Sequence, residues 1–241
     1  MSLCVIRNDE VVSSRVDDDD EKRSEKLWVE IGRLLCGAGL TVQEIGLFAV
    51  CIGPGGFTGL RVGLAAAKGF ATAARKPIIG ITSLEAAATT TDKSVPSVVA
   101  LVNAYKGEVY SQLFSIDSEG GPVAENEPLV STLRSALNRV REIEGLVLVG
   151  DAALANEEEI RGLNAEMRRE GTHELSRSWA IQHSETSSAE ALARLALMKY
   201  LKGEEGTPEH ITACYVRLAE AEIKLAKGLL GSKIERVRCK Q

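Results

Sequence analysis

The chain has 241 residues, which suits one large domain or two lobes of about a hundred residues each. Apolar residues make up 44% and charged residues 26%, as in ordinary globular proteins. Aromatic residues are only 4%, so the core must rest on Ala, Leu, Val and Ile. The formal net charge of −5 argues against this chain supplying the main nucleic-acid-binding surface, because neutralising phosphates requires clustered Lys and Arg.

Three further classes are disfavoured. The five cysteines are scattered without a CxxC pair, so neither a disulfide framework nor a zinc site is indicated. The N-terminal residues turn polar too early for a signal peptide. The longest apolar region, residues 58–74, is interrupted by Arg61 and Lys68 and does not predict a membrane span. We expect a cytoplasmic protein without membrane contact.

The first part of the chain predicts strands alternating with helices. Residues 3–16 predict two short strands joined at Asn8 and Asp9. Apolar residues at helical spacing predict a helix over residues 24–38, and residues 45–53 predict a buried parallel strand. The segment GPGGFTGLRVGLAAAKGF at 53–70 follows directly. A further strand then precedes a helix that begins at Ser83.

From about residue 95 the pattern restarts. VPSVVALVNA and GEVYSQLFSID predict two strands, residues 131–142 a helix, 145–151 a buried strand and 188–202 an amphipathic helix. Two similar halves suggest a duplicated α/β architecture. We therefore expect an N-terminal lobe over 1–93, a C-terminal lobe over 94–222 and a basic tail over 223–241. The tail is either a flexible end or a contact for RNA or a protein partner.

The glycine-rich segment allows two interpretations. A glycine turn between a strand and a helix can point backbone N–H groups at a phosphate, helped by the helix dipole. The segment lacks the Gly-Lys-Ser/Thr ending of a P-loop, and Thr58 stands where the dinucleotide pattern has its third glycine. The signal for a specific nucleotide motif is therefore weak.

The helix that follows favours the second interpretation, a surface covered by protein. Arg61, Lys68 and Arg75 recur every seven residues and form one narrow stripe. The other sides are apolar: one face has Leu60, Leu64, Ala67, Ala71 and Ala74, and another has Gly59, Gly63, Ala66, Phe70 and Ala73. A glycine inside a helix costs up to about 1 kcal/mol relative to Ala, and close packing of another backbone is the usual compensation.

Helix 24–38 also has a second apolar edge, formed by Trp28, Gly32 and Leu35. Two neighbouring helices, each with an unused apolar face, predict a helical protein–protein interface. Another part of the same chain covering these faces is the equally weighted alternative. The residues predicted for the interface are Trp28, Ile31, Gly32, Leu35, Gly59, Arg61, Gly63, Ala66, Ala67 and Phe70.

Four stretches, taken in order, resemble the bacterial TsaB (YeaZ) family. They are CIGPGGFTGLRVGLAAAKGF at 51–70, GITSLEAAA at 80–88, KGEVY at 106–110 and CYVRLAEAE at 214–222. The resemblance covers roughly residues 3 to 222. The family-motif residues are Gly53, Pro54, Gly55, Gly56, Phe57, Thr58, Gly59, Leu60, Arg61, Ser83, Glu85, Tyr215, Arg217 and Glu220.

The resemblance implies a fold and a role. The fold is that of the acetate kinase–sugar kinase–Hsp70–actin superfamily, with two RNase H-like lobes. The role is that of a non-catalytic subunit supporting a TsaD-type transferase, with a TsaE-type ATPase, in forming threonylcarbamoyl-adenosine next to the anticodon of tRNAs reading ANN codons. The family's first two helices pair with those of the transferase or of a second copy.

The same resemblance implies a homodimer when the protein is alone, contact with tRNA only through partners, no cofactor of its own, and room for ATP at the interface with partners. The chain departs from the family in three places. It begins at what would be the second strand, so either the first strand of lobe one is missing here or the start codon is misassigned. Gly56 stands where a Ser is common, and Arg23, Ser24 and Glu25 stand where His-Ser-Glu is usual.

The alternative function is a small ATP-dependent phosphotransferase of the same superfamily. It would need carboxylates for magnesium, and Asp151 and Glu85 are the candidates, Asp151 in a vestigial nucleotide site. The histidines His173, His183 and His210 lack the His-x-x-x-His spacing of the catalytic relatives, and G-x-S-x-G is absent. We predict no catalytic and no metal-binding residue.

Overall fold

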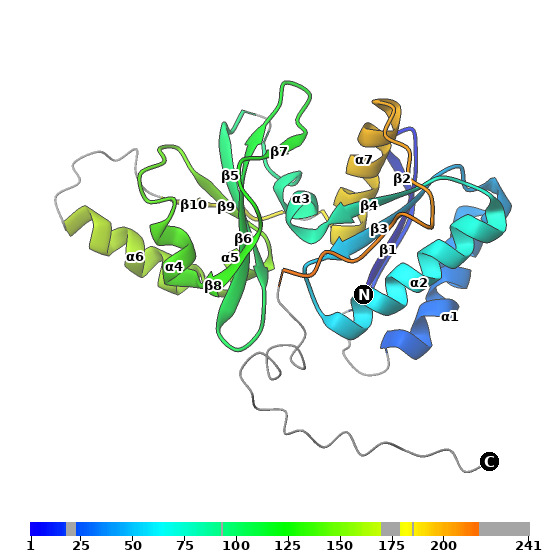
Figure 1. Ribbon diagram of the computed structural model, residues 1–241, viewed down its shortest axis with the longest axis horizontal. Helices are drawn as coiled ribbons and strands as arrows, with labels where there is room; N and C mark the ends of the chain where they lie inside the picture. Colours follow the sequence, from blue (N-terminus) through cyan, green and yellow to red (C-terminus); the bar gives the residue numbers. More distant parts are fainter. Residues whose placement is uncertain (18–22, 93, 170–178, 185, 217–241) are drawn as a thin grey trace, which may run out of the picture.

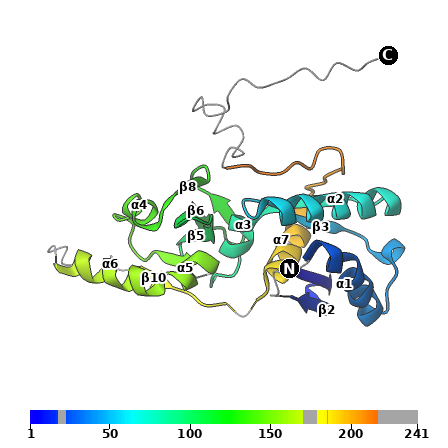
Figure 2. The same cartoon turned by 90° about the horizontal axis from the view of Figure 1, so that it is seen from below.

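The computed structural model describes residues 1–17, 23–92, 94–169, 179–184 and 186–216. Helices and strands form two groups that lie side by side (Figures 1 and 2). One group is built around β1–β4 with α1 and α2, and the other around β5–β10 with α4–α6. The mixed α/β class predicted from the sequence is therefore confirmed. The expected basic tail lies outside the described residues.

The first group begins with the antiparallel hairpin of β1 (Ser2–Arg7) and β2 (Glu10–Val16). Asn8 and Asp9 have φ of 49° and 72°, as a two-residue hairpin turn requires. The remaining elements of the group are α1 (Arg23–Ala38), η1 (Val42–Glu44), β3 (Phe48–Gly53), α2 (Phe57–Ala74), β4 (Ile78–Thr82) and α3 (Ser83–Ala88). β3 and β4 pair in parallel across α2, and form a sheet separate from the hairpin.

The second group contains a six-stranded sheet in the order β10-β9-β5-β6-β7, with β8 also paired to β6. Its strands are β5 (Ser97–Asn103), β6 (Glu108–Ile116), β7 (Pro122–Ala124), β8 (Leu129–Thr132), β9 (Val147–Val149) and β10 (Ala180–Ile181). Its helices are α4 (Leu133–Asn138), α5 (Asp151–Ala155) and α6 (Glu157–Arg169). β5 and β6 pair antiparallel over seven residue pairs and give this group a long central hairpin.

The two faces of β5 build two cores. Val99 and Leu101 belong to one cluster with Leu137, Leu148 and Ile160, beneath α4–α6. The alternate residues Val98 and Ala100 belong to another, with Leu84 of α3 and Phe114 of β6. This is the period-two alternation of a strand covered on both faces. Helix α3 therefore joins the two groups of elements.

The end of the described chain returns to the first group. α7 (Ser188–Leu201) packs on β1, β3, β4 and α3, and its Leu195 is buried with Ile81. Residues 206–216 then run past the first group, and Ile78 donates its backbone N–H to the carbonyl of Gly206 at 3.0 Å. A Cβ at Gly206 would overlap the carbonyl oxygen of Ile78, so only glycine permits this approach.

This return differs from the expectation that residues 94–222 form one lobe, because α7 buries its apolar side against strands of the first group. The helix expected over 131–142 is shorter, since α4 ends at Asn138 and is followed by turns. Within the described residues, no helix has the length and apolar character needed to cross a membrane.

Candidate functional site

The turn between β3 and α2 is built from glycine for reasons internal to the chain. The Gly53–Pro54 peptide bond is cis, and Gly53 has φ of 99°. A Cβ on Gly53 would lie 3.0 Å from the carbonyl oxygen of Cys214 and 3.1 Å from Leu60 Cδ2. Ser83 Oγ donates to the carbonyl of Pro54 at 2.6 Å. The motif's first residues therefore tie β3, α2, α3 and the segment 206–216 together.

Arg61 lies between two aromatic rings at the start of α2. Its guanidinium carbon lies 3.6 Å from the centroid of the Phe57 ring. Its Nε donates to the Tyr215 hydroxyl at 3.1 Å, and the Phe57 and Tyr215 ring centroids are 5.8 Å apart. Residues that the sequence separates by more than 150 positions thus form one cluster. Arg217 and Glu220, the other two family-motif residues of the stretch 214–222, lie outside the described residues.

Glu85 has a structural role. Its carboxylate accepts from the backbone N–H and hydroxyl of Thr82, each at 2.8 Å, and forms a 2.9 Å ion pair with Lys199 of α7. Burial alone would raise the pKa of Glu85, but the hydrogen bonds from Lys199 and Thr82 outweigh it and hold the pKa below its ordinary value. Glu85 therefore caps α3 and ties it to α7. Lys199 has no sequence signal for this contact, because its partner is 114 residues away.

The other predicted polar residues are dispersed. Asp151 begins the short helix α5 and accepts the backbone N–H of Asn103 at 3.2 Å. His183 lies 3.8 Å from Glu157, His210 contacts Thr207, and His173 falls outside the described residues. Within the described ranges no three His, Cys, Asp or Glu side chains are grouped so that they could hold a metal ion.

The outer sides of α1 and α2 form an exposed surface, which we call the α1–α2 face. Trp28 and Val29 are 58% and 53% exposed, and Trp28 meets the Phe70 ring at a centroid distance of 5.6 Å. The face consists of Trp28, Val29, Gly32, Gly59, Gly69 and Ala73, all of them exposed. A Cβ at Gly32, Gly59 or Gly69 would meet no atom of the described residues within 4 Å. Packing among the described residues therefore does not explain these glycines.

The remaining residues predicted for a partner interface lie around and beneath this face. Ile31, Leu35, Gly63 and Phe70 are half-buried, and Arg61 is exposed at the first turn of α2. Ala66 is buried, and Ala67 packs against the core formed by Val50, Ala71 and Ile78. Of the other motif residues, Gly55, Gly56 and Thr58 belong to the turn and first helical residues of α2.

Comparison with known proteins identifies the family. The family model described as TsaD, tRNA N6-adenosine threonylcarbamoyltransferase, matches residues 17–147, which is more than half of the chain. The chain therefore belongs to this family of tRNA threonylcarbamoyladenosine proteins. Its curated relatives include proteins named TsaB.

The chain is 26% identical over 140 residues to the tRNA threonylcarbamoyladenosine biosynthesis protein TsaB of Escherichia coli K12. That match covers 57% of this chain and 61% of the E. coli protein. The TsaB of Haemophilus influenzae is 38% identical over 89 residues, covering 36% of this chain and 38% of that protein. The matched part is thus less than two thirds of either relative.

A solved structure shares the fold over nearly the whole chain. It is a Pseudomonas aeruginosa protein described as similar to the peptidase YeaZ, with a TM-score of 0.70 and 20% sequence identity. The superposition covers 90% of this chain and 94% of the other. The likeness establishes a YeaZ-like fold.

Proposed function

We propose that the chain is a non-catalytic scaffold subunit in tRNA threonylcarbamoyladenosine biosynthesis. It supports a TsaD-type transferase in forming threonylcarbamoyl-adenosine next to the anticodon of tRNAs reading ANN codons, in the cytoplasm and together with a TsaE-type ATPase. It has no cofactor of its own, the interface with its partners has room for ATP, and it forms a homodimer when alone. The family and the names of the relatives support the pathway.

The observation that carries the scaffold role is the set of open glycines on the α1–α2 face. Each glycine in a helix interior costs about 0.5–1 kcal/mol relative to Ala, and no neighbour among the described residues compensates at Gly32, Gly59 or Gly69. Glycine and alanine let a second helix approach closely. Trp28 and Val29 beside them supply the apolar anchors that fill an interface centre. The face therefore suits a pair of helices from a transferase or from a second copy.

The scaffold would act by positioning. Helices buried against the α1–α2 face stabilise the partner conformation that presents them, and this shifts the partner toward a state competent for transfer. The phosphotransferase alternative is less well supported. To bind magnesium, Glu85 would have to leave Lys199 and the Thr82 cap. Magnesium-dependent ATP hydrolysis that is lost in Asp151→Ala would favour that alternative.

We also propose that the two groups of elements are RNase H-like lobes, and that the described part of lobe one contains no counterpart of the family's first strand. The β1–β2 hairpin and the β3–β4 pair are separate sheets, although α7 packs on both. A further strand between β1 and β3 would join them into one sheet. This arrangement supports a first lobe of about residues 1–93 that α7 completes, and a second lobe that begins at about residue 94 and ends before α7.

The scaffold role is tested by placing a charge on the α1–α2 face. Gly69→Arg adds a side chain where a Cβ has no neighbour, so the chain should fold but no longer co-purify with a TsaD-type transferase. Gly162→Arg, at an equally open glycine of α6, is the matched control and should bind normally. The proposal fails if the two variants bind the transferase, and support tRNA modification, equally well.

A further inference from the structure

A cleft lies where the end of α2 meets the segment that follows α7. It has a volume of about 450 Å³, which is within the range of clefts that hold small molecules. Its walls come from the last turns of α2, the residues that lead into β4, the end of α7 and the segment after it. The lining residues are Ala71, Thr72, Arg75, Lys76, Pro77, Tyr200, Glu205, Gly206, Thr207, Pro208 and Glu209.

Contacts within the first group of elements hold the walls of this cleft in place. The backbone N–H of Ile78 donates to the carbonyl of Gly206 at 3.0 Å, and Lys68 Nζ of α2 donates to the carbonyl of Ile211 at 3.0 Å. Ile211 also packs against the core that contains Ala71 and Ile78. The segment after α7 is therefore fixed against α2 and β4, and a ligand would meet a preformed cleft.

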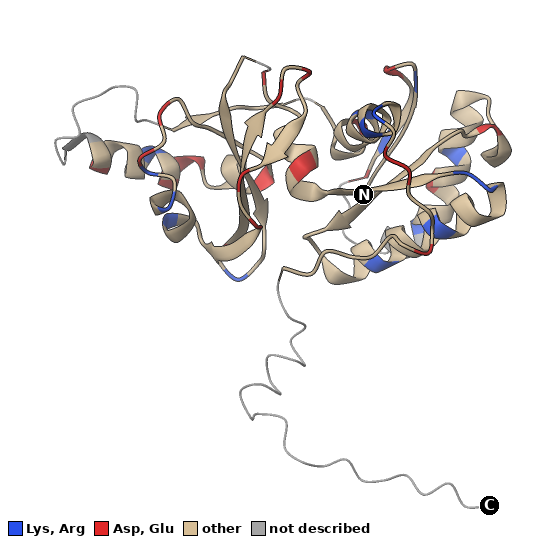
Figure 3. Ribbon diagram, turned by 45° about the horizontal axis from the view of Figure 1, so that its top comes forward, with Lys and Arg blue, Asp and Glu red and all other residues tan. Residues whose placement is uncertain are grey.

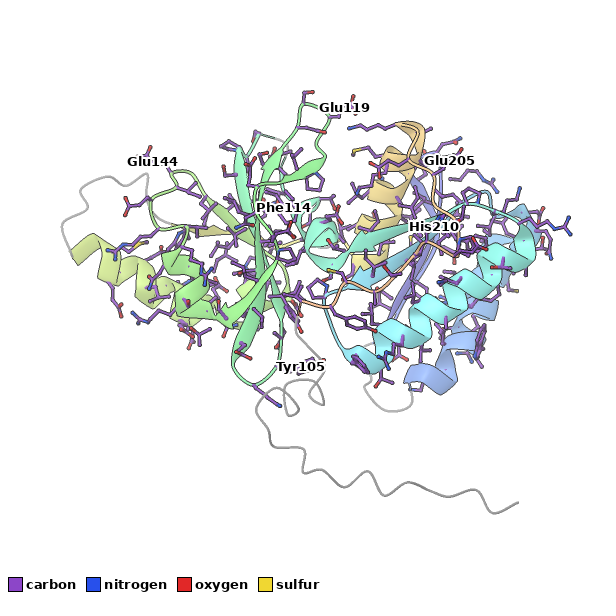
Figure 4. The ribbon with its side chains drawn as sticks, in the orientation of Figure 1. Tyr105, Phe114, Glu119, Glu144, Glu205 and His210 are labelled. Carbon is purple, nitrogen blue, oxygen red and sulfur yellow. The ribbon has the colours of Figure 1, made fainter. Side chains whose placement is uncertain are left out.

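Four charged side chains line the cleft, two of each sign. Arg75 and Lys76 follow α2, whereas Glu205 and Glu209 belong to the segment after α7 (Figure 4). Figure 3 shows the same division, with Lys and Arg along α2 and acidic residues on the segment that passes it. Among the described residues, the side chains of Arg75, Lys76 and Glu205 form no hydrogen bond or ion pair. Both signs of charge thus line the cleft without a partner there.

Arg75 occupies a backbone position that favours glycine. It ends α2 with φ of 54° and ψ of 48°, the left-handed conformation in which many helices end. Glycine adopts this conformation freely, whereas a residue with a Cβ is strained in it. No contact of the Arg75 side chain with another described residue offsets the strain. Such strain concentrates at sites that bind ligands.

The acidic side of the cleft suits a positively charged group. Hydrogen bonds from its own backbone N–H and from Thr207 lower the pKa of Glu209 below its ordinary value, so this carboxylate is ionised at neutral pH. The half-buried Tyr200 adds an aromatic ring to the wall, and the face of such a ring attracts cations. The carbonyl end of the α2 dipole lies beside the cleft and also favours positive charge.

We propose that this cleft binds a free amino acid. Its α-carboxylate accepts charge-assisted hydrogen bonds from Arg75 and Lys76, and its α-ammonium group donates to Glu205 and Glu209 beside the ring of Tyr200. A small zwitterion satisfies both sets of charges at once, whereas a simple anion or a simple cation leaves one set without a partner. The inference goes beyond the scaffold role and does not depend on it.

A thermal-shift screen of the full-length chain against each of the twenty standard amino acids tests the cleft. The best ligand should raise the Tm by about 3–5 °C at about ten times its Kd. Its carboxamide lacks the carboxylate and its N-acetyl form lacks the ammonium charge, so each should bind about tenfold more weakly. The inference is wrong if no amino acid raises the Tm, or if either modified form binds as tightly as the amino acid.

Variants of the cleft assign each contact. Arg75→Gly combined with Lys76→Gln should fold, because glycine suits the left-handed backbone, and should bind the amino acid about tenfold more weakly. This double variant should also no longer distinguish the amino acid from its carboxamide. Glu205→Gln should weaken binding about fivefold, whereas Glu10→Gln, at an exposed glutamate of β2, should bind as the parent does. Parent-like binding by the cleft variants, or an equal loss in Glu10→Gln, overturns the inference.

This inference and the scaffold role can fail separately, because the amino acid is titrated against the chain alone. Gly69→Arg should lose the transferase and keep amino-acid binding, whereas Glu205→Gln should do the reverse. A chain that binds an amino acid with these dependences but never binds a transferase contradicts only the scaffold role. A chain that binds the transferase but no amino acid contradicts only the present inference.

Discussion

The α1–α2 face and the outer side of α6 are both exposed helical surfaces containing glycine, yet they differ in what surrounds the glycine. Around Gly162 on α6, Arg161 pairs with Glu157 at 2.6 Å, and Glu166 pairs with Arg134 at 2.9 Å. Around Gly32 and Gly69 stand Trp28, Val29 and Ala73 instead. The two surfaces lie at opposite ends of the molecule (Figure 1).

This difference separates a surface adapted to water from one suited to a partner. Charged pairs on α6 keep their ions hydrated and add little to stability, as is usual for exposed pairs. A large exposed indole beside open glycines gains nothing from solvent, and contiguous apolar patches mark interaction sites on soluble proteins. Exposure alone therefore does not distinguish the proposed interface from the outer side of α6, whereas the chemistry around each glycine does.

The largest effect is expected for a glycine that the chain itself surrounds. Gly53→Ala must fit a Cβ at a φ of 99° between Cys214 and Leu60, which combines strain with close contact. We expect the free energy of unfolding to fall by about 3 kcal/mol. Urea unfolding measures it, with Gly55→Ala, where a Cβ has open space, as the control. Equal stability of the two variants would contradict the role of Gly53 in holding β3, α2 and the segment 206–216 together.

The next effect is on association. Trp28→Ala should weaken transferase binding by about 2 kcal/mol, roughly thirtyfold, because a large exposed aromatic at an interface centre is a typical hot spot. Leu154→Ala, an exposed apolar residue on α5, is the matched control and should bind normally. Titration calorimetry with the purified transferase gives both values. Similar losses of transferase affinity in Trp28→Ala and Leu154→Ala would show that the α1–α2 face binds the transferase no more specifically than the exposed apolar surface of α5 does.

Local patterns in the sequence were sufficient to predict much of the secondary structure of the first group of elements. The Asn8–Asp9 turn and α1 are confirmed within a residue or two, and the helix expected after the glycine segment is confirmed as α2, because helical spacing and turn chemistry are local properties. Spacing did not reveal that Ala66 is buried while its neighbours Gly59 and Gly69 are open. That depends on which elements pack against each side of α2, which no periodicity specifies.

Long-range placement was also beyond the sequence patterns. α7 was predicted as a helix but not as part of the first group, since an amphipathic pattern does not say which sheet it faces. The cleft at the end of α2 gives no signal either, because Arg75 and Glu205 line it together only after α7 brings the chain back to the first group. The motif residues were found by resemblance, and their contacts only by the fold.

A smaller effect on stability, which depends on pH, is expected where Glu85 of α3 contacts α7. The pKa of Glu85 is lower in the folded chain than its ordinary value of 4.5. The stability it contributes is therefore fully present above pH 4.5 and is lost as the pH falls through the folded pKa. Glu85→Gln should lower the free energy of unfolding by about 1–2 kcal/mol at pH 7. This difference from the parent should shrink on acidification, because the parent then loses the Glu85 contribution too. Urea unfolding at several pH values checks this, and an unchanged acid dependence in Glu85→Gln would contradict it.

The smallest effect separates the two surfaces most directly. Gly69→Ala and Gly162→Ala should each raise the free energy of unfolding by about 0.5–1 kcal/mol, because alanine favours the helix and no atom obstructs its Cβ. Only Gly69→Ala should weaken transferase binding, since its methyl group holds the partner helix away. A gain in stability accompanied by a loss of binding has no explanation within the isolated chain. If Gly69→Ala is more stable and binds as tightly as the parent, the glycine was not kept for a partner.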